Sequence, residues 1–115
     1  MHFYSARLLF VILVADSLAR KRNLYDESVV VFRARNPAHA FKRALTLGRQ
    51  QETNYKNDKG QGVRWAFVEI MKLDYVGRTV DGKEVASVLH DRTTKKRISA
   101  GHVFHPELSK PEESF

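Results

Sequence analysis

The sequence predicts an α+β domain with a four- to five-stranded, mostly antiparallel sheet in β-β-α-β-β order and one helix packed on one face. Most of the chain consists of alternating or continuous apolar runs separated by polar turns, which is typical of strands. One segment after residue 36 instead repeats its apolar side chains every three or four positions, which is typical of a helix that packs on a sheet. The order of these segments favours antiparallel pairing.

The first expected strand covers residues 4–14. Every second side chain of this range is apolar, and the opposite face is also apolar in its second half. We therefore expect a central strand that is covered on both sides there. A secretory signal is the alternative, because the apolar run Leu8–Val14 precedes Ser17-Leu18-Ala19, which resembles a small-x-small cleavage site. The strand is the better interpretation, since only Arg7 supplies a basic charge ahead of the run. A buried strand in place of a signal predicts a cytoplasmic protein that is not in the membrane.

Leu24–Arg35 is the second expected strand, because its Val29–Phe32 run is rich in β-branched and aromatic side chains. Asn36 and Pro37 then predict the start of a helix. Asn accepts hydrogen bonds from the first N–H groups of a helix, and Pro at the first helical position loses no hydrogen bond. We expect this helix to end between residues 53 and 57. Its expected apolar face consists of Ala38, Phe41, Ala44, Leu45 and Gly48.

A third long strand is expected at Val63–Tyr75, and residues 55–57 can pair with its start across the turn-forming residues that precede it. Asp81-Gly82 then signals a two-residue hairpin, because both residues tolerate the positive φ angles of the favoured turn. The returning strand would be Glu84–His90. One helix shields only part of such a sheet. Strands that are apolar on both faces therefore imply that the other face contacts the C-terminal segment, a second subunit or a partner.

Length and composition fit one modest core. The chain has 115 residues, of which 43% are hydrophobic and 29% are charged. We expect residues 1–105 to form a single α+β domain, and residues 106–115, with two Pro and three Glu, to form a flexible acidic tail. The chain has no cysteine, which excludes disulfides, thiolate metal sites and a cysteine nucleophile.

The sequence contains no clear catalytic constellation, so we predict that the protein is not an enzyme and uses no cofactor. A Gly-rich phosphate loop before a helix and a G-x-S-x-G elbow are both missing. His102 and His105 have a spacing that could ligate a metal, with His90 or Asp91 completing the site of a small hydrolase. The Gly before and the Pro after these two histidines argue against the helical turn that such a pair needs. Two semi-exposed histidines without a metal are the simpler expectation.

The net charge of +7 makes an anionic partner the main alternative. If the basic side chains converge on one side, they would bind a phosphate backbone with strong salt dependence, and Tyr55 and Trp65 could add stacking surfaces. The other interpretation is a soluble basic surface. The candidate contacts are Arg20, Lys21, Arg22, Lys42, Arg43, Arg92, Lys95, Lys96 and Arg97.

Three segments resemble one small bacterial family. They are Tyr4-Ser5-Ala6-x-Leu8-Leu9-Phe10, Tyr25-x-Glu27-Ser28-x-Val30 and Tyr55-Lys56-Asn57-x-x-Gly60-x-x-Val63-x-Trp65-x-Phe67-Val68. The family is a domain of unknown function, the group numbered 4288, and the resemblance covers about residues 3–90. It implies a one-domain bacterial protein and brings no catalytic residues. It also makes one hairpin a candidate binding surface, although aromatic and branched pairs suit a structural hairpin as well. The candidate residues of this hairpin are Tyr55, Asn57, Arg64 and Trp65.

The predicted function is a non-catalytic binding domain that takes a protein partner, or forms a homodimer, through an exposed face or edge of its sheet. Immunity proteins and small adaptors are of this type. A nucleic-acid-binding protein that uses the basic clusters is the alternative, and the small hydrolase comes third.

Overall fold

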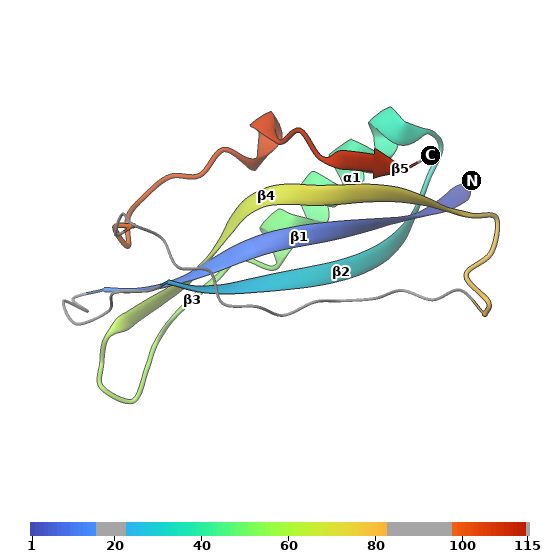
Figure 1. The fold of residues 1–115 in the computed structure, drawn as a ribbon. Coiled ribbons are helices and arrows are strands. Elements are labelled where there is room, and N and C mark those ends of the chain that lie inside the picture. Colours follow the sequence, from blue (N-terminus) through green and yellow to red (C-terminus); the bar gives the residue numbers. More distant parts are fainter. Residues whose placement is uncertain (16–22, 83–97, 115) are drawn as a thin grey trace.

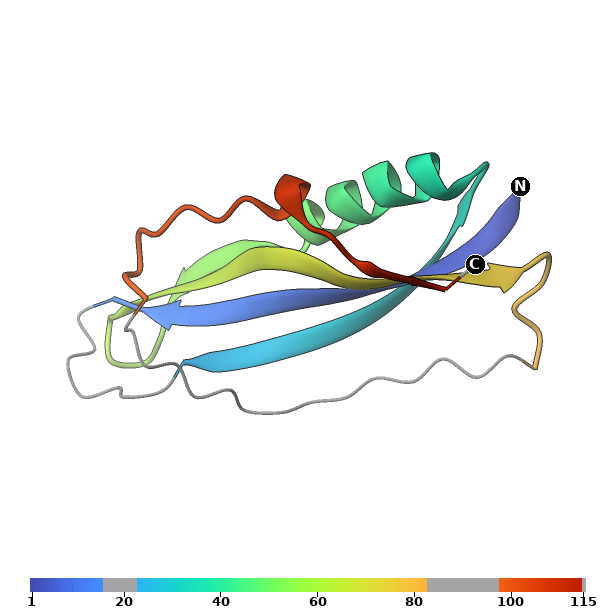
Figure 2. The ribbon, with the colours of Figure 1, turned by 45° about the horizontal axis from the view of Figure 1, so that its top comes forward.

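The structure is a computed structural model that describes residues 1–15, 23–82 and 98–114 (Figure 1). Four antiparallel strands form the sheet in the order β2-β1-β4-β3, and a short fifth strand pairs with β4 in parallel. One helix lies across one face of the sheet (Figure 2). This arrangement confirms the predicted α+β class and its mostly antiparallel sheet. The elements are β1 (His2–Val14), β2 (Leu24–Ala34), α1 (Pro37–Gln50), β3 (Thr53–Lys56), β4 (Gly62–Gly77), the 3₁₀ turn η1 (Pro106–Leu108) and β5 (Glu112–Ser114).

β1 is a central strand, paired with β2 along one edge and with β4 along the other. Its successive side chains point to opposite faces of the sheet. Leu8 and Phe10 are buried toward α1, and Val11 and Leu13 are buried on the opposite face. The predicted burial on both faces in the second half of this strand is therefore confirmed.

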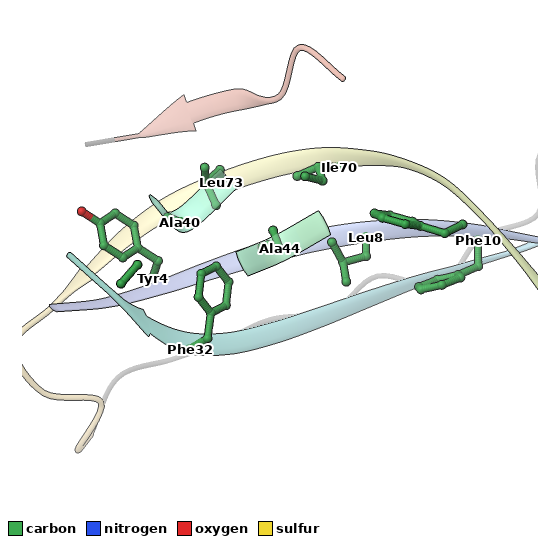
Figure 3. Packing of buried hydrophobic residues seen from close by; sticks show 11 residues of the cluster. Tyr4, Leu8, Phe10, Phe32, Ala40, Ala44, Ile70 and Leu73 are labelled. Atoms are coloured by element: carbon green, nitrogen blue, oxygen red, sulfur yellow. The ribbon is translucent and has the colours of Figure 1, made fainter. Parts of the chain in front are cut away.

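The main core lies between α1 and the sheet. Ala40, Ala44 and Gly48 form the buried stripe of the helix, and these small residues let its backbone approach the strands closely. At Gly48, a Cβ atom would lie 2.6 Å from Cδ2 of Phe67 and closer still to two other carbons of that ring. The predicted apolar face was wrong at Ala38, which is exposed, because the helix turns Ala40 toward the sheet instead. Figure 3 shows residues of this core, in which Ala40 and Ala44 lie in one cluster with Tyr4, Leu8, Phe10, Phe32, Ile70 and Leu73.

The start of α1 is as predicted, but its end is not. Asn36 Oδ1 accepts a 2.8 Å hydrogen bond from the His39 N–H, and a proline is the first helical residue. The helix ends at Gln50 rather than between residues 53 and 57. The reason is tertiary, because the residues from Thr53 onward pair with β4 and form β3.

β3 and β4 form the hairpin that the sequence predicts, with Tyr55 opposite Val63. The turn between them contains Gly60 at a φ angle of 75°, a backbone conformation that favours glycine. The predicted returning strand Glu84–His90 lies outside the described residues. The fifth strand that the structure does show is β5, which the sequence analysis did not anticipate.

The C-terminal segment packs against the sheet, which differs from the predicted flexible tail. Pro106 is buried, and Arg49 Nη2 lies 3.0 Å from Glu107 Oε2. Ser109 Oγ accepts a hydrogen bond from the Ile70 N–H at 3.0 Å, and β5 pairs with β4. Residues 106–114 are few and of mixed polarity, so they show no clear periodicity. Their sequence therefore does not reveal that they will accept hydrogen bonds from N–H groups at the edge of β4.

Candidate functional site

The outer edge of β4, the edge that faces away from β1, is closed by the chain itself. β3 pairs with its first residues and β5 with a later part. Between these two strands, Glu52 Oε2 accepts the Phe67 N–H at 3.2 Å, and Ser109 Oγ accepts the Ile70 N–H. Side chains thus replace the neighbouring strand where none is present. This edge offers few open backbone groups to another protein.

The outer edge of β2 is different. Among the described strands β2 stands at the end of the sheet, and no described residue pairs with its outer edge between Ser28 and Ala34. The side chains at this part of the strand include the β-branched Val29 and Val30, which are half-buried, and Val31, which is 39% exposed. Open backbone groups beside β-branched side chains are a template for strand pairing.

The four candidate residues of the β3–β4 hairpin do not form one exposed surface. Asn57 Oδ1 accepts the N–H of two residues in the turn and so closes it. Arg64 Nη1 donates to the carbonyl oxygens of Ala100 at 3.1 Å and His102 at 2.6 Å. Trp65 is half-buried against the main core. Of the four, Tyr55 alone is strongly exposed, so this set mainly holds the chain's own structure together.

The face away from α1 is partly covered by the same chain. Val11, Leu13 and Ala66 form a second apolar cluster on that face. The C-terminal segment packs on it with Ile98, Ala100 and Phe104, while Tyr25 and Val68 of the sheet adjoin it. The residues in contact with this cluster thus precede the predicted tail 106–115, which was one of the three expected covers.

The other half of this face carries charges of both signs. In the strand register, Arg7 lies opposite Lys72, and Ser5 lies opposite Asp74. Lys72 Nζ is 3.7 Å from Asp74 Oδ2. Arg7 Nε and Asp74 Oδ1 are buried without a hydrogen-bond partner in the described part of the chain. A half-buried, charged surface is a poor docking site for an apolar partner, which directs attention to the edge of β2 rather than to the face.

Two of the nine predicted anion contacts lie in the described ranges. Lys42 and Arg43 are exposed on α1, near Arg35, which directly precedes the helix cap. Partial burial, and then the charges of Arg35, Arg43 and Lys42, lower the pKa of His39. We call Arg35, Lys42 and Arg43 the basic cluster. Outside the described residues lie Arg20, Lys21, Arg22, Arg92, Lys95, Lys96 and Arg97.

Most of the net positive charge belongs to residues outside the described ranges. The described residues hold twelve Lys and Arg and ten Asp and Glu, a balance of +2 out of the total of +7. The remaining +5 belongs to residues 16–22 and 83–97. Arg35 was not among the anion contacts predicted from the sequence. Its position directly before the Asn36-Pro37 cap was the signal that could have placed it beside the helix.

The histidines do not form a shared site in the described ranges. The His102 ring packs edge-on against Phe104, with ring centroids 4.6 Å apart. His105 Nδ1 lies 3.0 Å from Glu107 Oε1. Both His90 and the neighbouring aspartate lie outside the described residues. Within residues 1–15, 23–82 and 98–114, no three potential metal ligands come together, and α1 is too short and too polar to cross a membrane.

Comparison with known proteins gives one result. A family model for a domain of unknown function, DUF4288, matches residues 3–87. This range contains β1, β2, α1, β3 and β4, and it ends before the C-terminal segment that closes the outer edge of β4. Searches of curated proteins and of solved structures give no significant match. Because the family model covers most of the sequence, the chain belongs to the DUF4288 family.

Proposed function

We propose that the protein is a non-catalytic, protein-binding domain of the bacterial cytoplasm that forms a homodimer through the outer edge of β2. The observation that carries the proposal is that no described residue pairs with that edge between Ser28 and Ala34. The bacterial assignment rests on the family resemblance. The place of Leu8–Val14 in the central strand, where most of these side chains are buried, supports the cytoplasmic assignment.

Edge strands bind other polypeptides because their outer N–H and C=O groups can extend a sheet. On β4 the chain satisfies such groups itself, as at Phe67 and Ile70. On β2 the described residues provide no comparable cover from Ser28 to Ala34. A strand added there would satisfy the backbone groups and bury the exposed side chain of Val31.

The charges along β2 favour a second copy in antiparallel orientation. Asp26 lies near the start of the strand, and Arg33 and Arg35 lie at and just beyond its end. An antiparallel copy brings the acidic start of one strand to the basic end of the other, whereas a parallel copy brings like charges together. A two-fold axis at Val30 gives this arrangement, with one continuous sheet and both helices on the same side.

Disulfide cross-linking tests both the pairing and its register, because the natural chain has no cysteine. With the axis at Val30, residue 29 of one copy lies opposite residue 31 of the other. Directly opposite residues have Cα atoms about 4.5–5.5 Å apart, which a disulfide can span. We expect a mixture of Val29→Cys and Val31→Cys to cross-link efficiently and each variant alone to cross-link poorly. Efficient cross-linking of one variant alone would contradict the register.

Light scattering coupled to size-exclusion chromatography tests the homodimer independently. We expect a dimer for the wild type and a monomer for Val31→Lys, because lysine on an edge opposes strand addition. Val80→Lys is the matched control, since Val80 is 38% exposed but lies beyond the end of β4. A monomeric wild type without any cross-linking would overturn the proposal.

A further inference from the structure

Three cations surround the N-terminal half of α1. Arg35 directly precedes the cap, Lys42 and Arg43 lie in the second turn, and all three side chains are exposed. His39 lies among them. Its backbone N–H donates to Asn36 Oδ1 at 2.8 Å, and its Nδ1 accepts the Arg35 N–H at 3.0 Å. These two hydrogen bonds hold the His39 imidazole beside Arg35 at the start of the helix.

The basic cluster has no acidic partner in the described part of the chain. Arg49, near the other end of the same helix, forms an ion pair with Glu107, but none of the three cations forms one with a described residue. The first turn of α1 also contains no acidic residue. The pKa of His39 is lowered first by partial burial and then by the charges of these three cations. The second effect is expected where no acidic group offsets a positive potential.

We propose that the basic cluster binds the phosphate backbone of a nucleic acid without reading its base sequence. The exposed side chains stand on the convex surface of a helix, so they can follow a row of phosphates but cannot enclose a small anion. The Arg43 guanidinium lies 5.9 Å from the centroid of the Phe32 ring. Contacts of this kind position a nucleic acid but carry no sequence information.

Fluorescence anisotropy with labelled single- and double-stranded oligonucleotides at two salt concentrations tests this site. We expect Lys42→Gln/Arg43→Gln to weaken binding at the lower salt by about tenfold or more. On duplex DNA, the slope of log affinity against log salt should fall by nearly two, about 0.9 for each phosphate that the protein no longer neutralises. The matched control is Lys56→Gln/Lys59→Gln, which removes the same charge from exposed positions on β3 and its turn. This control should change affinity by less than about twofold.

The His39 ring gives a second readout by NMR. Bound phosphates offset the neighbouring cations, so they should raise the pKa of His39. The proposal is overturned if the wild type binds no oligonucleotide at low salt, if both double variants lose affinity equally, or if His39 does not respond. Binding to anionic lipid vesicles but not to oligonucleotides would also overturn it. None of these outcomes depends on the β2 homodimer.

Discussion

At Gly48, a missing side chain sets the distance between α1 and the sheet. A Cβ atom there would overlap the Phe67 ring, which is itself fully buried and packs against Phe10 with ring centroids 5.4 Å apart. The helix is therefore held at the separation that glycine permits. Glycine lowers intrinsic helix stability by about 1 kcal/mol relative to alanine, so its presence reflects this contact rather than helix propensity.

We predict that Gly48→Ala destabilises the protein by about 1–3 kcal/mol, because overpacking outweighs the gain in helix propensity. The free energy of unfolding in urea is the measurement. Thr46→Ala is the control, since Thr46 is exposed on the same helix and should change stability by less than about 0.5 kcal/mol. Stabilisation by Gly48→Ala would show that Phe67 moves aside at no cost.

His39 should titrate below its ordinary pKa of 6.5, because partial burial and the basic cluster disfavour the imidazolium. The folded state then binds fewer protons than the unfolded state as the pH falls. This contribution to stability is complete above pH 6.5 and is lost as the pH falls through the lowered pKa of the folded protein. An NMR titration of the ring measures the shift. Lys42→Gln/Arg43→Gln should raise the pKa of His39, and an unchanged value would contradict the assigned cause.

At the scale of elements, the outer edge of β4 shows how a short C-terminal segment acts as structure. The hydroxyl of Ser109 accepts the Ile70 N–H and also donates to the Pro106 carbonyl, so it links η1 to the sheet. The buried ring of Pro106 and the pairing of β5 with β4 add to this attachment. The segment therefore replaces the missing neighbour of an edge strand.

We predict that Ser109→Ala costs about 1 kcal/mol of stability and leaves the amide of Ile70 without its partner. Hydrogen exchange at Ile70 should become faster, and urea unfolding should give the loss of free energy. Lys110→Ala, at the exposed neighbouring position, should leave both quantities unchanged. Equal protection of the Ile70 amide in Ser109→Ala would mean that another group satisfies it.

For the whole molecule, the proposed homodimer makes stability depend on protein concentration. A tenfold change in concentration is worth about 1.4 kcal/mol per dimer, so the wild-type Tm should rise by a few degrees over that range. Thermal unfolding followed by circular dichroism measures this rise. Val31→Lys, with its blocked β2 edge, should show one Tm at all concentrations. A wild-type Tm that is independent of concentration would contradict the dimer.

Local chemistry in the sequence determined the elements of this protein. The Asn36–Pro37 cap, the alternation along β1, the β-branched run of β2 and the turn before β4 each depend on neighbours within a few residues. Dihedral preferences and periodicity act over the same short distances, so these features could be predicted. The family match over residues 3–87 agrees with the resemblance seen in three of these segments.

Only the tertiary structure decided which strand edges the described residues close. The end of α1, the role of Arg64 and the attachment of the C-terminal segment depend on contacts between residues far apart in the chain. No local pattern encodes such contacts, because an N–H group at a strand edge binds whichever acceptor the fold brings near. The position of β2 at the end of the sheet, and hence the candidate surface, follows from strand order for the same physical reason.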